Sequence, residues 1–378
     1  MSARLFPTQE IGSLMKPAWL VKGLRGAELS EGDYAELGRW SKELRLAKEA
    51  KRVEELLKAH PGPRRDLELR DLASIHQIRY LEAAGLDFVF DGEVHRAEMY
   101  EHPVRNSKGF TFYGHVRSFD NKYYLKAAAT SRVGFLRPYH VEELEFISKH
   151  AKKTVKVPIT GPYTLADWSF NEYYLKKLHK SKKRLTPKDR LFEAKRELTL
   201  DIATEIIRPN LKALLKAGAP VIQIDEPAAT TKPEEVGIFV EAFNEATKGL
   251  DAKFPVHVCF SDYALMFPQA LEMKRCSMWD WEFANKEASG NGYQYLDLLN
   301  EYGDRRKVGL GVVDIHVDTV ETPELVRDRV LRAAELLEDP ERIVVNPDCG
   351  LRTRSAEVSF AKLRNMVKGT EMAREVLT

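Results

Sequence analysis

Short apolar runs that end in polar or glycine-containing motifs recur along the chain, and helix-like stretches separate most of them. The clearest amphipathic helices are predicted over residues 193–217 and 322–338. Eight β-then-α units in one chain are typical of a (β/α)8 TIM barrel, an α/β fold. The eight runs cover residues 7–13, 87–93, 155–162, 220–227, 254–260, 278–283, 308–316 and 342–350. Such barrels carry their active sites at the carboxyl ends of the strands, which is where the polar motifs fall.

Two regions of the chain are additional to the eight β/α units of a minimal barrel. Residues 29–65 are highly charged and carry leucines at helical spacing, which predicts extra helices after the first strand. Residues 104–154 are rich in aromatic side chains, and the stretch 110–114 alternates like a hairpin strand. We expect this second region to be an insertion between the second and third strands that walls the barrel mouth. The prediction is therefore one domain over residues 1–378, with insertions at about 29–65 and 104–154.

Composition excludes several classes of protein. The 59 basic and 57 acidic residues nearly cancel, which argues against a dedicated nucleic-acid or membrane-surface protein. No apolar run approaches the ~18 residues that a membrane helix needs. Residues 1–7 lack the apolar core of a signal peptide, so we expect a cytoplasmic protein.

A strongly basic run occupies residues 176–190. One interpretation is a solvated loop between helices. The other is a site for the anionic tail of a substrate or for an acidic partner, and the sequence leaves both open.

The candidate chemistry centres on His257 and Cys259, two residues apart in a predicted strand. Side chains at this spacing point to one face of a strand, so an imidazole and a thiol should converge. A second thiol, Cys349, follows in Asn-Pro-Asp-Cys-Gly, and a carboxylate lies in the segment 279–283. These are zinc ligand types, and three or four of them from separate strands could form a tetrahedral site. The third cysteine, Cys276, has no motif around it and is expected to be an ordinary buried thiol.

Seven motifs in this order resemble the catalytic, C-terminal half of the cobalamin-independent methionine synthases, across nearly the whole chain. The resemblance covers only that half of the long enzymes, so we expect the chain to be most similar to the short "core" members of the family. The motifs are Ile11-Gly-Ser13, Gly92-Glu93, Thr160-Gly-Pro162 with Trp168-Ser-Phe170, Gln223-Ile-Asp-Glu-Pro-Ala228, His257-Val-Cys259, Asp314-Ile-His316 and Asn346-Pro-Asp-Cys-Gly350.

The resemblance implies roles for particular residues. It implies that zinc is held by His257, Cys259 and Cys349, with Glu282 near the position of a fourth, carboxylate ligand. The amino-acid part of homocysteine would be held by Ile11, Ser13, Glu93 and Asp225. The same resemblance makes His316 and Asp225 the predicted catalytic residues, and Trp168 would stack on the pterin of a folate donor.

The carboxylates could also have purely structural roles. Glu93 and Asp225 could be barrel-interior groups paired with Arg or Lys, but both end strands at one barrel mouth, which favours charge-assisted binding of an ammonium. Glu226 follows Asp225 directly, so strand alternation should turn it away from the site into a structural role. As a general acid, His316 would protonate the leaving nitrogen of a folate.

The predicted reaction is attack of the zinc-bound homocysteine thiolate on a methyl group, which gives methionine. The donor is either a methylated folate or a methyl-corrinoid, and a corrinoid could arrive on a carrier protein. One alternative function is alkylation of another thiol, such as coenzyme M, although its sulfonate should favour cations over the carboxylates present. The other is a non-catalytic zinc-binding protein, against which the substrate motifs argue.

Overall fold

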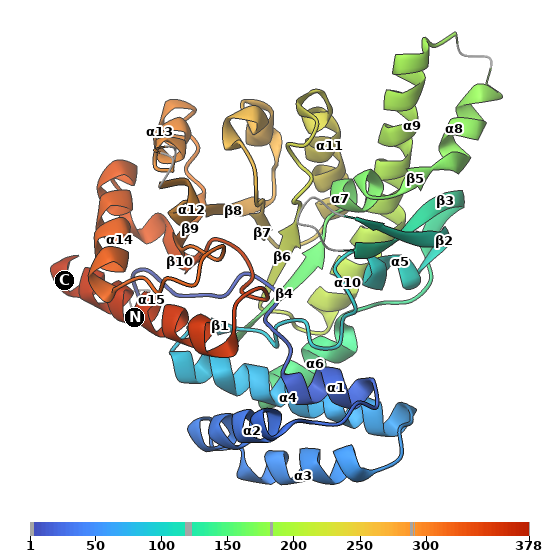
Figure 1. Cartoon of the computed structure of the whole chain (residues 1–378). Helices are drawn as coiled ribbons and strands as arrows, with labels where there is room; N and C mark the ends of the chain where they lie inside the picture. The colour runs from blue at the N-terminus through green and yellow to red at the C-terminus, as the bar shows by residue number, and fades with distance from the viewer. Residues whose placement is uncertain (1–3, 118–122, 182–183, 288–289, 291, 378) are drawn as a thin grey trace.

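The computed structural model describes residues 4–117, 123–181, 184–287, 290 and 292–377 (Figure 1). Its centre is a curled sheet of seven strands in the order β1-β4-β6-β7-β8-β9-β10. All neighbouring strands run parallel, as expected when helices connect successive strands. The strands are β1 (Phe88–Val89), β4 (Thr154–Thr160), β6 (Val221–Asp225), β7 (Phe254–His257), β8 (Cys276–Glu282), β9 (Lys307–Val313) and β10 (Ile343–Pro347).

Residues 7–9 close this sheet into a barrel. Thr8 forms an isolated bridge with Val345 of β10, and Gln9 forms one with Phe88 of β1. The Gln9 nitrogen donates to the Val345 carbonyl at 2.9 Å, and the Phe88 nitrogen donates to the Thr8 carbonyl at 3.0 Å. Both edges of the sheet are therefore paired, and the predicted barrel is confirmed. The predicted first strand is reduced to these bridges.

Helices cover the outside of most β/α units. They are α4 (Pro63–Ala84), α6 (Val141–His150), α7 (Pro162–Asp167), α11 (Val236–Thr247), α12 (Ala284–Glu287), α13 (Gln294–Glu301), α14 (Pro323–Leu337) and α15 (Ala356–Leu377). The predicted helix at 322–338 is α14, whose N-cap hydroxyl, from Thr322, accepts from the Leu325 nitrogen. The unit between β7 and β8 departs from the pattern, because it contains two 3₁₀ turns, Tyr263–Met266 and Gln269–Glu272, in place of an α-helix.

The long helix predicted at 193–217 is interrupted. It is built from α9 (Pro187–Ile202), a π-helical turn (Ala203–Ile207) and α10 (Arg208–Lys216). Pro209 has no N–H to bond the carbonyl four residues earlier, which explains why the regular ladder widens at this point.

The N-terminal insertion is helical, as predicted. It contains α2 (Glu31–Glu43) and α3 (Ala47–Lys58), and α1 (Ala18–Leu24) precedes it. Helix α2 packs on α1 and α3, and both of these pack on α4. Of these three helices, Figure 1 shows α2 and α3 below α4 and α1 next to it, all away from α11 and α13. They share a small apolar cluster with α4 that includes Trp19, Leu37, Val53 and Leu69. This layer enlarges the protein on one side without entering the barrel.

The second insertion contains the predicted hairpin. Strands β2 (Ser107–Arg117) and β3 (Tyr123–Phe135) pair antiparallel, after the short helix α5 (Glu101–Arg105). The short β5 (Phe170–Asn171) adds to β3, and α8 (Glu172–His179) packs on β3. The basic run begins in α8, where Lys177 pairs with Glu197 at 2.8 Å; its residues 182 and 183 lie outside the described part of the chain. Among the described helices, none is long and apolar enough to cross a membrane.

Polar side chains fill part of the barrel interior. The Gln9 amide nitrogen donates to Asp280 Oδ1 at 2.7 Å and to Asn346 Oδ1 at 3.2 Å. Gly309, on the strand between these two partners, leaves the room they need: a Cβ there would lie 1.8 Å from Asp280 Oδ1. The barrel core is thus a packed layer of hydrogen-bonded polar groups under the strand ends.

Candidate metal centre

The predicted metal ligands lie at the carboxyl ends of three strands. His257 is the last residue of β7, Glu282 is the last of β8, and Cys349 lies two residues beyond β10. Cys259 does not lie on the strand predicted for it, because β7 ends at His257. The chain turns directly after it, where Phe260 adopts a positive φ of 51°. The turn, and not strand alternation alone, brings the second ligand to the site.

Three of these side chains converge. Potential ligand atoms of His257, Cys259 and Cys349 all lie within 4.8 Å of one another. His257 Nε2 lies 3.4 Å from Cys349 Sγ, while its Nδ1 lies 3.0 Å from the backbone carbonyl of Asp280. A carbonyl can only accept, so Nδ1 carries a proton and Nε2 faces the sulfur. This is the orientation in which a histidine binds a metal through Nε2.

The charges of the cluster suit a cation. A hydrogen bond from Cys259 and the adjacent His257 hold the pKa of Cys349 well below its usual range, so this thiol is the one that ionises first. Burial favours the neutral ring of His257, yet the Cys349 thiolate raises the pKa of His257 to about 9. A thiolate is the form of cysteine that binds metal.

Glu282 lies beside this cluster but is not one of the three converging residues. Its Oε2 accepts from the Phe260 nitrogen at 3.0 Å and from Asn285 Nδ2 at 3.2 Å. Its Oε1 is buried and has no hydrogen-bond partner among the described residues. Burial and, to a smaller extent, the charge of Cys349 raise the pKa of Glu282 to about 7. A buried carboxylate oxygen without a partner is costly, and a metal ion would relieve that cost.

The donor set therefore fits zinc. Two sulfurs, one imidazole nitrogen and an available carboxylate oxygen are the ligand types of a tetrahedral zinc site. The orphaned Oε1 of Glu282 is the observation that supports a fourth ligand. Cys276 lies apart at the start of β8, where its thiol contacts the Met278 carbonyl at 3.5 Å, in agreement with the structural role predicted for it.

The predicted homocysteine residues of the N-terminal segment lie next to the cluster. The Ile11 side chain is buried, and the backbone of Ser13 packs against Gly350, where a Cβ would lie 2.8 Å from the Ser13 nitrogen. The Glu93 carboxylate lies beside Gly12 and accepts from Arg96 at 3.3 Å. The contact with Gly350 therefore places this segment beside the Cys349 turn.

Glu93 is held in an unusual backbone conformation. Its φ is 64°, and that of the preceding Gly92 is 66°. A Cβ at Gly92 would lie 2.7 Å from Leu14, so only glycine fits there. A left-handed glutamate is strained, and such strain concentrates at functional positions. Burial raises the pKa of Glu93, and the nearby Arg96 opposes that shift.

The carboxyl groups of Asp225 and Glu226 face different partners, as predicted, although β6 ends at Asp225 and Glu226 lies just beyond it. Asp225, the last residue of β6, accepts from Gln223 Nε2 at 2.7 Å. Burial raises the pKa of Asp225 to about 7, and the charge of His257 opposes that shift. Glu226 faces the start of α7, where its Oε2 accepts from the Thr164 nitrogen at 2.7 Å. Glu226 is thus a helix cap, and Asp225 is the group available to the site.

His316 and Trp168 lie farther from the cluster. His316 is exposed after β9, with its Nε2 3.3 Å from Asn285 Nδ2 and its ring 5.1 Å from that of Phe260. Asn285 also bonds Glu282, so one amide links His316 to the candidate fourth ligand. Trp168 ends α7 and packs against Tyr124 of the insertion hairpin, with ring centroids 5.5 Å apart. Its described contacts are wall packing.

Sequence reasoning assigned no role to Lys156 or Glu10. Lys156 is 2% exposed within β4, and its charge acts on Asp280, Glu10 and Asp225. Burial raises the pKa of Glu10 to about 8. Three buried carboxyl groups thus lie within the influence of one ammonium group. The sequence did contain one sign of this network, because Lys156 is a charged residue inside an otherwise apolar predicted strand.

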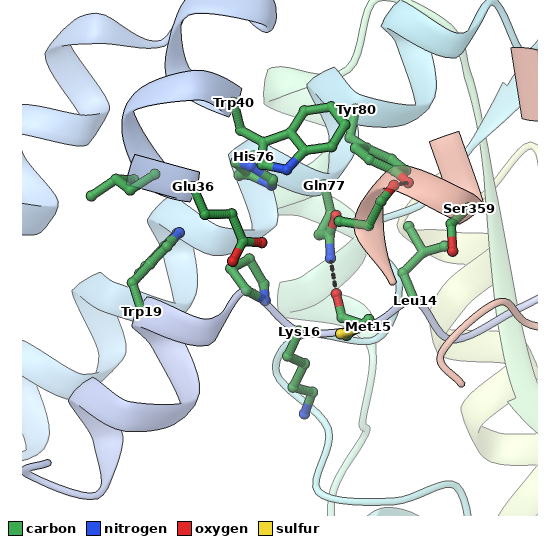
Figure 2. A pocket seen from close by; sticks show the side chains of 13 residues that line it. Leu14, Met15, Lys16, Trp19, Glu36, Trp40, His76, Gln77, Tyr80 and Ser359 are labelled. Carbon is green, nitrogen blue, oxygen red and sulfur yellow. Dashed lines mark hydrogen bonds between the residues drawn. The ribbon is translucent and has the colours of Figure 1, made fainter. Parts of the chain in front are cut away.

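A separate cavity of about 20 Å³ lies between the N-terminal helices and α4 (Figure 2). It has room for about one water molecule. Trp40 and His76 line it, and Gln77 on its wall donates to the Met15 carbonyl at 2.7 Å. The cavity is thus distinct from the metal cluster, but Gln77 helps to hold the segment that continues from Ser13.

Comparisons with known proteins identify relatives over nearly the whole chain. The family model described as the catalytic domain of cobalamin-independent synthase matches residues 64–372. The methionine synthase of Thermoplasma acidophilum is 38% identical and covers 95% of this chain and 96% of its own. The methionine synthase of Thermococcus kodakarensis is 37% identical, and the match covers 100% of this chain and 96% of that protein. The solved B12-independent methionine synthase from Shewanella sp. W3-18-1, in complex with selenomethionine, has a TM-score of 0.76 at 23% identity, over 99% of both chains, and shares the fold.

Proposed function

Because this chain belongs to the cobalamin-independent methionine synthase family, we propose that it is a zinc-dependent methyltransferase that transfers a methyl group to the thiol of L-homocysteine. Its relatives are methionine synthases, so the general activity is that of a methyltransferase in methionine synthesis. The observation that carries the finer proposal is the convergence of His257, Cys259 and Cys349 within 4.8 Å, beside an unpartnered carboxylate oxygen.

The proposed metal ligands are His257, Cys259, Cys349 and Glu282. A zinc ion bound by them would deprotonate a substrate thiol and hold its sulfur for attack. Glu282 is the ligand that we expect to give way to that sulfur, since it is the hardest donor of the four. Its Oε2 would stay bound to Phe260 and Asn285, so the carboxylate would not need to leave the site.

The amino-acid end of homocysteine would bind beside the metal. Glu93 and Asp225 would accept hydrogen bonds from the substrate ammonium, and residues Ile11 to Ser13 would line the remaining side. This pair of carboxyl groups, Glu93 and Asp225, favours a substrate that carries an ammonium group. It disfavours a sulfonate-bearing thiol such as coenzyme M.

The methyl donor is a methylated folate or a methyl-corrinoid, free or on a carrier protein. His316 would serve a folate donor as the acid that protonates its leaving nitrogen. Trp168, on the aromatic wall with Tyr124, would contact the donor.

The test combines metal ligation and turnover. Cobalt replaces zinc in the protein, and its thiolate charge-transfer absorption is recorded while L-homocysteine is added. Methionine formation is then measured with methyltetrahydrofolate and with methylcobalamin. We expect homocysteine to change the spectrum, C349S to abolish that change, and turnover to identify the donor.

Cys276→Ser is the matched control, because this buried thiol lies outside the three-residue cluster. It should keep both the metal and the spectral change. If homocysteine leaves the spectrum of the wild-type protein unchanged while another thiol alters it, the homocysteine assignment is wrong. A spectrum that no thiol alters would instead indicate a closed, non-catalytic metal site.

A further inference from the structure

Gln223 joins two groups that we assign to the amino-acid end of the substrate. It lies on β6 and is fully buried. Its Nε2 donates to the backbone carbonyl of Ile11 at 2.8 Å and to Asp225 Oδ1 at 2.7 Å. One side-chain amide therefore sets the separation between a carbonyl of the N-terminal segment and a carboxylate of the barrel wall, two positions 214 residues apart in numbering (225 − 11).

Lys156, on the neighbouring strand β4, determines which way this amide faces. Its Nζ donates to Gln223 Oε1 at 2.6 Å. An ammonium group has no acceptor, so the atom that faces it must be the amide oxygen. The amide nitrogen must then face Ile11 and Asp225, and each of its two hydrogens has a partner. Because these groups are buried, their bonds are protected from competing water.

We propose that Gln223, oriented by Lys156, is a positioning residue for the substrate ammonium: it holds the Ile11 carbonyl and the Asp225 carboxylate at a fixed separation. The carbonyl keeps a second lone pair and the carboxylate a second oxygen, so both can still accept from an ammonium. This inference rests on the proposed function, because it requires a substrate that carries an amino group.

The three hydrogen bonds of Gln223 explain why a glutamine suits this position. Glutamate would still accept from Lys156, but it has no N–H for Ile11 and would set a second negative charge against Asp225. Methionine has a similar length but neither donates nor accepts comparably. A glutamine alone of these three accepts from Lys156 and donates to both site groups.

The test compares two thiols that differ only in the amino group: L-homocysteine and 4-mercaptobutanoic acid. Their dissociation constants are measured on the cobalt-substituted protein through the thiolate absorption. Wild type should prefer homocysteine. Gln223→Met should weaken homocysteine binding about tenfold or more, the loss expected for misplaced charge-assisted hydrogen bonds. The dissociation constant of 4-mercaptobutanoic acid should stay within about twofold of the wild-type value, because that thiol has no ammonium group to contact the site.

Gln77→Met is the matched control. Gln77 is also a buried glutamine that holds the N-terminal segment, through the Met15 carbonyl, but its described hydrogen bonds do not include Asp225. This variant should keep the wild-type preference for homocysteine. If Gln223→Met does not fold, Gln223→Leu replaces it, with the same expected loss of preference, because leucine also lacks the N–H donors for Ile11 and Asp225.

The outcomes separate the two proposals. A Gln223 variant that retains the wild-type preference, or that weakens both thiols equally, overturns the positioning role while the proposed function stands. A wild-type protein that binds both thiols equally well overturns the use of an ammonium site, and the homocysteine assignment fails with it.

Discussion

Asp348 binds the backbone of Asn285: its Oδ2 lies 2.8 Å from the Asn285 nitrogen. Its Oδ1 accepts from the two preceding nitrogens, of Phe283 at 2.9 Å and Ala284 at 3.0 Å. Asp348 directly precedes Cys349, a proposed ligand, and this bonded segment directly follows Glu282. One buried carboxylate thus joins the ends of β8 and β10 and holds two proposed metal ligands in register.

Asp348→Asn should loosen this junction, because an amide nitrogen placed against a backbone N–H cannot accept. We expect the free energy of unfolding of the metal-free protein to fall by about 1–3 kcal/mol. Metal affinity should fall about 10- to 100-fold, as for other groups that support ligands. Urea unfolding and a competitive metal titration measure the two effects. Asp304→Asn, which alters a buried Asp preceding β9 that bonds Trp279 at 3.0 Å, should cost stability alone.

Gly309→Ala should destabilise the barrel core. The added methyl group would lie 1.8 Å from Asp280 Oδ1 and 2.7 Å from Asn346 Oδ1, and both oxygens are bonded to Gln9. Overpacking of this kind costs about 1–3 kcal/mol, measured as a lower urea midpoint with an unchanged slope. Gly237→Ala, at the start of α11 with nothing within 4 Å, should not destabilise. Equal midpoints for Gly309→Ala and wild type would contradict this account of the interior.

His76 should make stability depend on pH. Burial lowers the pKa of His76 from 6.5 to about 4. The unfolded chain therefore takes up a proton below pH 6.5 that the folded ring refuses until about pH 4, so the free energy of unfolding falls as the pH drops through this window. The full loss is about 3 kcal/mol. His76→Phe keeps an aromatic ring against Trp19 and Trp40 but cannot be protonated.

Denaturant unfolding at several pH values between 7 and 4 measures this effect. The difference in unfolding free energy between wild type and the Phe variant should change in favour of the variant as the pH falls. Parallel curves for the two proteins would show that the buried ring contributes nothing to acid sensitivity.

His316→Gln should separate the two candidate donors. If His316 protonates the leaving nitrogen of a folate, its loss should lower kcat with methyltetrahydrofolate by about 10²- to 10⁴-fold. With methylcobalamin there is no such nitrogen, and kcat should change little. The variant and the wild type should bind homocysteine equally well in the cobalt-substituted protein. This measurement separates a loss of catalysis from damage to the binding site. A similar loss of kcat with both donors would argue for a role in holding Asn285 and Glu282.

Parts of the site could be predicted because the chemistry was concentrated in short motifs. His257, Cys259 and Cys349 are rare residue types at predicted strand ends, and parallel strands bring their carboxyl ends to one edge. Asp225 and Glu226 face different groups, as predicted, although β6 ends at Asp225 and Glu226 lies one residue beyond it. Cys259 reaches the site in a way that was not expected: it lies beyond the strand, which ends at His257, and the chain turns at Phe260.

The supporting contacts could not be predicted. Lys156, Gln223 and Asp348 each bond to a group far away in the chain. The place of Lys156 in an apolar strand marks it as unusual, but no local pattern identifies the partner of any of the three. Neither Asn285 nor Arg96 carried a signal beyond its residue type. Their roles depend on which side chains the closed barrel places within hydrogen-bond distance.

The sequence by itself determined the order of the β/α units, the two insertions and the residue types that suit a metal, since periodicity and ligand chemistry are local properties of a chain. Only the tertiary structure decided which oxygen of Glu282 is left without a partner and which amide sets Asp225 against Ile11. The physical reason is that burial removes water as a hydrogen-bond partner, and the way the strands close around the barrel fixes which protein groups lie within reach of each polar atom.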